Sequence, residues 1–245
     1  MDALQWSLFL TATFFGGLTS GLTGFAAGLV VSGVWLHVIT PTQTAVLIAA
    51  NGVITQAYGI WKVRHALQWR RVLPFVAGGA VGVPLGAYLL AYTNPPQLRI
   101  GVGVLLIAYS TYNLLRPKFA PVKSNGALDA GVGVLNGMLG GLTGLGGVIS
   151  TVWCQLGGGT KDAQRAVFQP VLFMTMLMTT MTFAASGFLA SFDILKLFAF
   201  GVPVLLLGLW TGVFLYGKLD DLTFRKIILI MLLLSGLSLV FPALR

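Results

Sequence analysis

Long apolar stretches, separated by short polar interruptions, dominate the chain. Uncharged runs cover 3–61, 72–98, 100–115, 197–217 and 227–244. A membrane-spanning helix needs about 20 apolar residues to cross a hydrocarbon core of about 30 Å. The pattern therefore predicts six full spans, at 42–61, 72–93, 97–115, 163–187, 195–217 and 224–243.

Two further apolar segments are too long for one span. Residues 4–39 number 36 and would form a helix of about 54 Å. Residues 127–158 are similar. Both carry glycines in their middles, which weaken a helix by about 1 kcal/mol per residue relative to alanine. We therefore expect breaks at Gly16–Gly24 and Gly137–Gly147. The sequence leaves open whether each segment is a re-entrant hairpin, two short spans or one kinked span.

The chain also repeats itself. Ordered matches include Gly21-Leu22-Thr23-Gly24 with Gly141-Leu142-Thr143-Gly144, Val34-Trp35 with Val152-Trp153, Ala45-Val46 with Ala166-Val167, Gly86 with Gly212, and Arg99 with Arg225. A stretch of prolines and lysines between Arg116 and Gly126 is typical of a linker. We therefore predict two transmembrane repeats, 1–119 and 120–245, each with a glycine-rich broken or hairpin segment and three full spans.

The positions of Lys and Arg distinguish two topologies. If each long segment is a hairpin that returns to its starting side, the two repeats are inverted, and 12 basic residues face 3 across the membrane. If each long segment crosses once, the repeats are parallel and the distribution is 9 against 6. Cytoplasmic loops are enriched in Lys and Arg, so the inverted arrangement is favoured. The prediction is a multi-pass protein of the cell inner membrane with its basic loops in the cytoplasm.

Composition supports a membrane protein and excludes several other classes. Hydrophobic residues make up 56% of the chain and charged residues 9%, whereas a soluble domain has about 25% charged residues. The net charge of +9 comes from loops, so no nucleic-acid partner is expected. With one cysteine, two histidines and no glutamate, we expect no metal site, and an intramembrane enzyme is the least favoured alternative. No Walker motif is present. We expect an all-α integral membrane protein, a polytopic helical bundle, without cofactors.

Inverted repeats with broken helices are typical of transporters that bind a solute near the bilayer midplane. A broken helix exposes backbone N–H groups with partial positive charge, which favour an anion. The predicted binding residues are Thr19, Ser20, Gly21, Thr23, Gly24, Asn51, Asn136, Gly141, Thr143, Gly144 and Gln169. The alternatives are close helix packing through small residues and hydrogen bonding between helices without a ligand.

Two basic residues follow the second predicted break. Lys161 and Arg165 are four residues apart, on one helical face, and could attract an anion to the cytoplasmic mouth. The alternative is that they set the orientation of the chain and pair locally with Asp162. Coupling to protons or ions and assembly into a homo-oligomer are left open by the sequence.

The paired glycine-rich breaks, the basic loop from Lys62 to Arg71 and the linker near residue 120 resemble the TauE/SafE sulfite-exporter-like permeases over essentially the full chain. The first repeat has Ala26-Ala27-Gly28 where the family has three glycines, and neither repeat has the family's following proline. The resemblance implies a secondary transporter of sulfite, a sulfonate or a related small anion. A structural or accessory membrane subunit is the alternative from another class.

Overall fold

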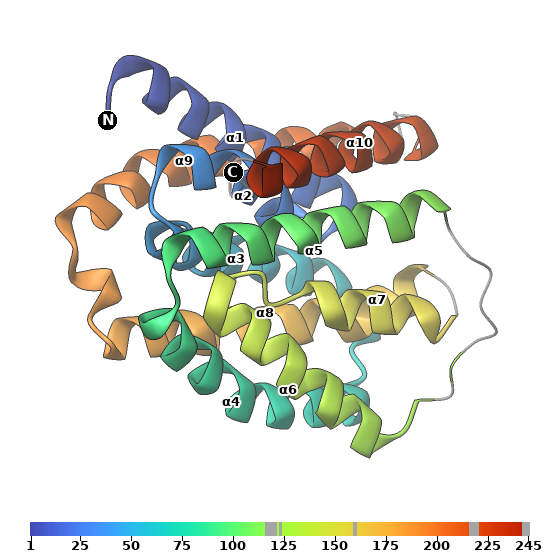
Figure 1. The fold of residues 1–245 in the computed structure, drawn as a ribbon. Coiled ribbons are helices and arrows are strands. Elements are labelled where there is room, and N and C mark those ends of the chain that lie inside the picture. The colour runs from blue at the N-terminus through green and yellow to red at the C-terminus, as the bar shows by residue number, and fades with distance from the viewer. Residues whose placement is uncertain (116–121, 123, 159–160, 216–220, 242–245) are drawn as a thin grey trace. The chain divides into compact units, whose positions relative to one another are not determined.

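A computed structural model describes residues 1–115, 122, 124–158, 161–215 and 221–241, and this part of the chain contains helices and no strand (Figure 1). The α-helices are α1 (Ala3–Thr23), α2 (Ala27–Val38), α3 (Pro41–Val63), α4 (Trp69–Tyr92), α5 (Pro95–Leu115), α6 (Gly126–Thr143), α7 (Val148–Leu156), α8 (Lys161–Ala185), α9 (Phe192–Leu215) and α10 (Asp221–Val240). Two short 3₁₀ helices, η1 (Arg64–Ala66) and η2 (Phe188–Ala190), precede α4 and α9.

Each of the six predicted spans corresponds to one long helix, namely α3, α4, α5, α8, α9 or α10. Within the described residues, α4, α5, α8 and α9 are both long and apolar enough to cross a membrane. The surface of α9 shows why a bilayer is needed. Leu207, Trp210 and Phe214 are 59%, 70% and 60% exposed and lie on one helical face. Such a face is solvated by lipid rather than by water.

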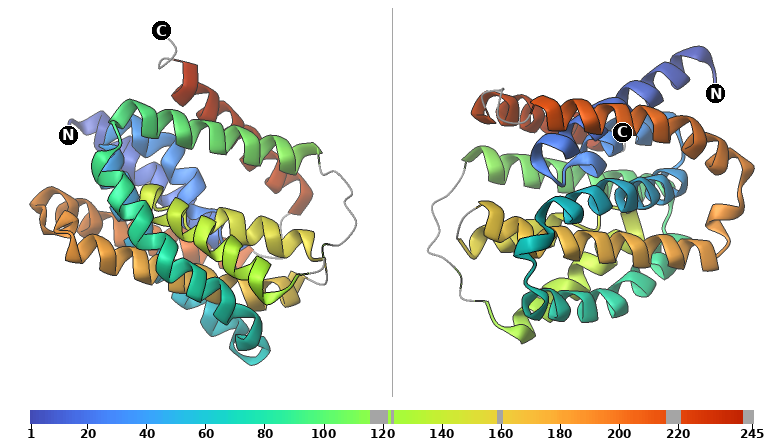
Figure 2. Two further views of the ribbon diagram at one scale, coloured as in Figure 1. Left: turned by 60° about the horizontal axis from the view of Figure 1, so that its bottom comes forward. Right: turned by 180° about the vertical axis from the view of Figure 1, so that it is seen from behind.

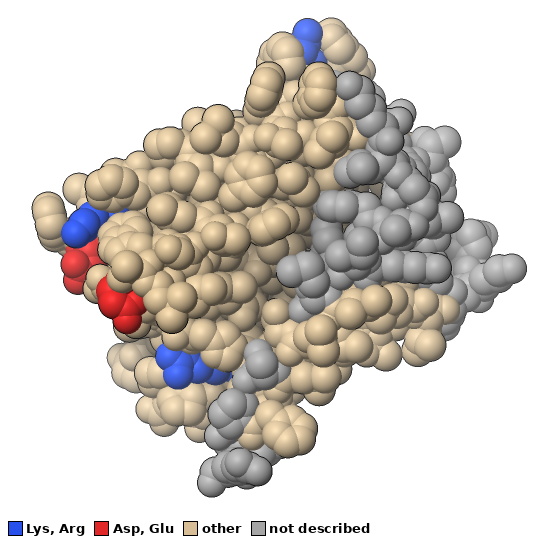
Figure 3. Space-filling model, turned by 90° about the horizontal axis from the view of Figure 1, so that it is seen from above, with Lys and Arg blue, Asp and Glu red and all other residues tan. Residues whose placement is uncertain are grey.

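The space-filling view agrees with a lipid-exposed surface. Broad uncharged areas separate the few Lys, Arg, Asp and Glu atoms on the described part of the face in Figure 3. The chain is therefore a multi-pass, all-helical membrane protein.

Both predicted breaks are present, and each converts a long segment into an antiparallel hairpin. Helix α1 ends at Thr23 and α2 begins at Ala27, whereas α6 ends at Thr143 and α7 begins at Val148. In the first hairpin, the Phe9 and Trp35 rings stack with centroids 4.8 Å apart. Of the alternatives that the sequence left open, the structure excludes one kinked span in both segments, whereas a re-entrant hairpin and two short spans both have this antiparallel form.

The chain divides into two compact units that each combine segments from both halves of the sequence. The first unit holds 1–44, 93–118 and 199–245, and the second holds 45–92 and 119–198. Helices α3 and α9 contribute residues to both units. These spatial units differ from the sequence repeats predicted at 1–119 and 120–245. They do not test that prediction, because a repeat is defined by sequence and not by contacts.

In the first unit, α1 packs on α2, and α5 packs on α10. Helices α5 (green) and α10 (red) can be followed in both views of Figure 2. Helix α1 also lies directly against α9. A Cβ atom on Gly17 would overlap the carbonyl oxygen of Leu205, and one on Gly208 would overlap that of Phe14. The small residues thus let two helical backbones touch.

The second unit repeats this arrangement with other helices. Helix α6 packs along α4, and α7 and α8 pack against α6. A Cβ atom on Gly82 would overlap the carbonyl oxygen of Val134, and one on Gly141 would overlap that of Val83. In both units, therefore, the first helix of a hairpin packs through glycines on a span that lies in the other half of the sequence.

Candidate functional site

The identical Gly-Leu-Thr-Gly sequences end the first helix of each hairpin in the same way. Gly24 and Gly144 adopt the left-handed conformation, with φ of 87° and 77°. Their N–H groups donate to the carbonyl oxygens of Ser20 and Gly140 at 2.8 and 2.7 Å. Glycine takes this conformation without the steric cost of a Cβ atom. The predicted site residues Ser20, Gly24 and Gly144 thus terminate α1 and α6.

The two threonines of these sequences form local hydrogen bonds. The Thr143 hydroxyl donates to the Leu139 carbonyl at 2.7 Å and accepts from the Leu145 N–H at 3.1 Å. Thr23 donates to the Thr19 carbonyl at 2.9 Å. A hydroxyl has one proton to donate, and in this structure that proton is directed at the backbone. Direct contact of either threonine with an anion stays a prediction.

Asn136 connects three elements at the bend of the second hairpin. From α6, its Nδ2 donates to the Gly146 carbonyl at 3.3 Å and to Thr175 Oγ1 at 3.4 Å. Its Oδ1 accepts from the Ser150 N–H at 3.3 Å. The side chain is fully buried. Asn136 therefore fixes the loop, the start of α7 and α8 relative to one another.

Two buried threonines near this bend differ from most threonines of the chain. Thr151 on α7 and Thr179 on α8 have hydroxyl oxygens that are buried and form no hydrogen bond within the described residues. By contrast, Thr175, Thr180 and others donate to the carbonyl four residues earlier in their own helix. That internal bond is the ordinary solution for a threonine in an apolar helix. The hydroxyls of Thr151 and Thr179 are directed elsewhere.

Thr151 belongs to the second hairpin, and packing places the Thr179 hydroxyl of α8 beside it. Thr179 Oγ1 would lie 3.3 Å from a Cβ atom on Gly140, next to the bend. Thr151 lies in the second turn of α7, whose N-cap residue, Gly147, provides no side-chain cap. In the first turn of α7, the Val148 N–H instead donates to the Leu145 carbonyl at 3.5 Å and the Ser150 N–H donates to Asn136.

The two predicted amide residues also carry buried oxygens without a partner. Asn51 Oδ1 and Gln169 Oε1 form no hydrogen bond within the described residues, and these side chains are 6% and 4% exposed. Gln169 lies against Gly59 of α3, its Nε2 3.0 Å from a Cβ position there. Both amides thus face the interior of the second unit, as a polar group in a span is expected to do.

The register of α7 and α8 relates Thr151 to Gln169. A Cβ atom on Gly146 would meet Thr175 Cγ2 at 2.6 Å, and one on Gly147 would meet Leu172 Cγ at 2.7 Å. Further along α7, Cys154 packs against the cluster that includes Val167 and Val171. The helices are therefore antiparallel, which brings Thr151 level with residues near Gln169. Sequence reasoning selected Asn51 and Gln169 but not Thr151 and Thr179. The only available signal for the threonines was the i, i+4 spacing of Thr175 and Thr179.

The remaining predicted site residues lie at packing positions or at the edge of the described structure. Thr19 donates to the Phe15 carbonyl at 2.7 Å. Gly21 and Gly141 pack against α9 and α4, where a Cβ atom would approach backbone atoms. Arg165 is half-buried and interacts with other residues. Lys161 begins α8, but its side chain lies outside the described residues.

A buried carboxylate closes the open end of the second hairpin. Asp129 on α6 accepts from Trp153 Nε1 at 2.8 Å and from the Ser124 hydroxyl at 2.6 and 2.7 Å. In the first hairpin, Trp35 Nε1 donates to the Phe9 carbonyl at 3.3 Å. The matched tryptophans of the repeat thus hold the second helix of each hairpin to the first. Sequence reasoning gave Asp129 no role.

No group of three or more His, Cys, Asp or Glu side chains that could hold a metal ion occurs among the described residues. The polar groups gathered at the second hairpin are instead hydroxyls, amides and backbone N–H groups. Neutral donors of this kind suit a solute that must bind and leave again, because their hydrogen bonds are weaker than those of charged groups.

Comparison with known proteins gives one match. A family model described as "Sulfite exporter TauE/SafE" matches residues 9–239. No curated protein and no solved structure gives a significant match. The family match covers nearly the whole chain and confirms the resemblance drawn from the glycine-rich breaks.

Proposed function

The chain belongs to the TauE/SafE sulfite exporter family, and from this premise we propose that it moves sulfite, a sulfonate or a related small oxyanion across the membrane. The family consists of membrane transporters and not of enzymes. The chain is accordingly a multi-pass transporter whose partners are a small solute and the surrounding lipid. We assign the oxyanion to the bend of the second hairpin.

The observation that supports this assignment is the pair of buried hydroxyls at Thr151 and Thr179 without hydrogen-bond partners. An unpaired hydroxyl in an apolar interior costs about 1–3 kcal/mol. Each would gain a partner from an oxyanion, but at successive positions: Thr151 lies level with Gln169, and Thr179 lies ten residues, about 15 Å, further along α8. The Gln169 amide would add a donor beside Thr151, and the partial positive charge at the N-terminal end of α7 would favour the anion there.

The hairpins also support the inverted topology. A hairpin returns the chain to its starting side, and this is the case in which 12 basic residues lie opposite 3. We propose that the basic loops are cytoplasmic and that the membrane is the inner membrane. The first hairpin then enters from the outside and the second from the cytoplasm. Lys161 and Arg165, just after the second hairpin, would raise the local anion concentration at the cytoplasmic mouth.

Flux in proteoliposomes tests the proposed function. The protein is reconstituted, and sulfite, a simple sulfonate, sulfate and chloride are each presented while flux is recorded. We expect sulfite or the sulfonate to be carried and to raise the thermal stability of the detergent-purified protein, because a ligand of the folded state stabilises it. If no anion is carried and none raises the melting temperature, the proposed function is wrong.

Two substitutions test the assigned site. Thr151→Val and Thr179→Val remove the unpartnered hydroxyls at nearly constant volume, so both proteins should fold. We expect each to raise the KM for the carried anion about 5- to 10-fold, corresponding to one lost hydrogen bond. Thr211→Val is the matched control, because the Thr211 hydroxyl donates to Leu207 of its own helix at 2.7 Å. Unchanged KM values in both site variants would remove the hydroxyls from the site.

A further inference from the structure

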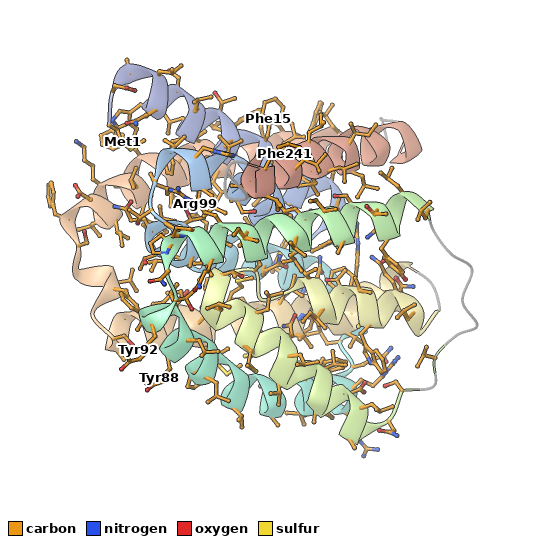
Figure 4. The ribbon with its side chains drawn as sticks, in the orientation of Figure 1. Met1, Phe15, Tyr88, Tyr92, Arg99 and Phe241 are labelled. Atoms are coloured by element: carbon orange, nitrogen blue, oxygen red, sulfur yellow. The ribbon has the colours of Figure 1, made fainter. Side chains whose placement is uncertain are left out.

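Arg99 lies near the N-terminal end of α5, beside the C-terminal end of α2 (Figure 4). Contacts along these helices set their register. The rings of Phe25 and Tyr109 meet edge to face at 6.3 Å, and a Cβ atom on Gly33 would lie 4.0 Å from Leu106 Cδ1. The two helices are therefore antiparallel, which places Arg99 level with His37, and the Arg99 charge acts on that side chain.

The guanidinium of Arg99 is incompletely paired. Its Nε is buried and has no hydrogen-bond partner within the described residues. Arg99 also makes no ion pair within that part of the chain. The residue belongs to a helix that is long and apolar enough to span the membrane. A charged group at such a place usually pairs with an opposite charge or serves a transported ion. Arg99 is half-buried, so a cation here without a carboxylate partner among the described residues is open to an anion from solution.

We propose that Arg99 binds the transported oxyanion at the non-cytoplasmic mouth of the protein and selects for anions with two adjacent charged oxygens. This inference rests on the proposed function and on the inverted topology, in which Arg99 lies opposite the cytoplasmic basic loops. The guanidinium presents parallel N–H groups that match two oxygens of a sulfite or sulfonate group at once. A halide offers a single centre and cannot use both donors.

Arg99 could instead have a structural role, the stabilisation of the C-terminal end of α2. The C-terminal end of a helix carries partial negative charge, so a nearby Arg stabilises it. The Ile39 N–H, however, already caps α2 by donating to the Trp35 carbonyl at 2.8 Å. A purely structural Arg99 would alter stability equally with and without anion. A binding role would instead alter the dependence of flux and stability on anion concentration.

The test compares Arg99→Gln and Arg99→Lys with the wild-type protein in proteoliposomes, with sulfite and chloride presented in turn. Arg99→Gln removes the charge and should raise the KM for sulfite at least 10-fold while lowering the maximal flux less than 2-fold. Arg99→Lys keeps the charge but loses the paired donors. It should raise the KM for sulfite about 3-fold and reduce the preference for sulfite over chloride.

Lys196→Gln is the matched control, because Lys196 is an exposed basic residue predicted on the same side of the membrane. Its sulfite KM should equal that of the wild type. Thermal unfolding at increasing sulfite gives a second readout, and Arg99→Gln should reduce the sulfite-dependent rise in melting temperature.

The outcomes separate the two proposals. A wild-type protein that neither carries nor is stabilised by any anion contradicts the proposed function and this inference together. A wild-type protein that carries sulfite, combined with an unchanged sulfite KM in Arg99→Gln, contradicts this inference alone. A loss of melting temperature in Arg99→Gln that is the same at every sulfite concentration, with an unchanged KM, assigns Arg99 to the packing of α2.

Discussion

Individual side chains in the second hairpin divide into those that build the bend and those that have donors left for a solute. Thr143 and Asn136 belong to the first group, because their hydrogen bonds join backbone groups of the break. Thr151 and Thr179 belong to the second group, since their hydroxyls have no partner within the described residues. Substitutions in the first group should change the stability of the protein, whereas substitutions in the second group should change its affinity for the anion.

Replacement of Asn136 by Leu should destabilise the protein without a selective effect on affinity. The Ser150 N–H and the Gly146 carbonyl would lose their partner in a buried place, which costs about 1–3 kcal/mol. The measurement is the melting temperature in detergent. Ser110→Ala is the control, because the Ser110 hydroxyl only reaches the Leu106 carbonyl of its own helix at 2.6 Å. Equal melting temperatures for Asn136→Leu and Ser110→Ala would contradict the role given to Asn136.

Sequence reasoning selected some of these residues and could not have selected the others. Asn51, Asn136 and Gln169 are amides in apolar stretches, where burial against protein is the only low-energy solution, and all three are buried. Thr151 and Thr179 could not be recognised this way. A threonine in an apolar helix usually satisfies its own hydroxyl, so only the missing hydrogen bond in the structure distinguishes them.

At the scale of helices, the first helix of each hairpin ends at a glycine in the left-handed conformation. Gly144 has φ of 77°, and a Cβ atom there would also overlap the Ala45 carbonyl oxygen. Gly144→Ala should therefore lower stability by more than the roughly 1–2 kcal/mol of the left-handed conformation alone. Gly131→Ala on the same helix is the control, because it has open space and should gain about 0.5–1 kcal/mol. Thermal unfolding distinguishes them, and two similar melting temperatures would argue against a fixed bend.

The glycine contacts between helices make a second prediction. Gly82→Ala and Gly208→Ala would each place a methyl group onto a backbone carbonyl of the neighbouring helix. Overpacking of this kind costs about 1–3 kcal/mol, so both should lower the yield of folded protein and its melting temperature. Gly101→Ala is the control, because this helical position has nothing within 4 Å and should gain about 0.5–1 kcal/mol, as Gly131→Ala should. Wild-type stability in both packing variants would show that these helices can separate without cost.

The helices themselves were predictable, but their partners were not. The excess length of 4–39 and 127–158 and their central glycines predicted the two breaks, and the structure confirms them at Gly24 and Gly144. The packing of α6 on α4 could not be derived, because glycines mark a helix as able to approach another helix closely but do not specify which one.

For the whole molecule, the testable property is topology. Cys154 is the single cysteine, so Cys154→Ser gives a background for single-cysteine labelling. With an impermeant thiol reagent applied to intact cells, Asn94→Cys and Ser191→Cys should react from outside, and Gln68→Cys only after permeabilisation. This result follows from the inverted arrangement. Labelling of Ser191→Cys only after permeabilisation, with Asn94→Cys still labelled from outside, would instead indicate parallel repeats.

The exchange of helices between the two halves affects how the protein is made. Helix α4 presents Gly78, Gly82 and Gly86 to α6, yet α6 is synthesised later. At about 5–20 residues per second, the ribosome needs roughly 2.5–10 s to pass from the end of α4 at Tyr92 to the end of α6 at Thr143. During that interval the nascent first half sits in the bilayer with its closest-fitting surface uncovered. A chain whose synthesis ends in this interval therefore keeps the glycine face of α4 without its native partner helix.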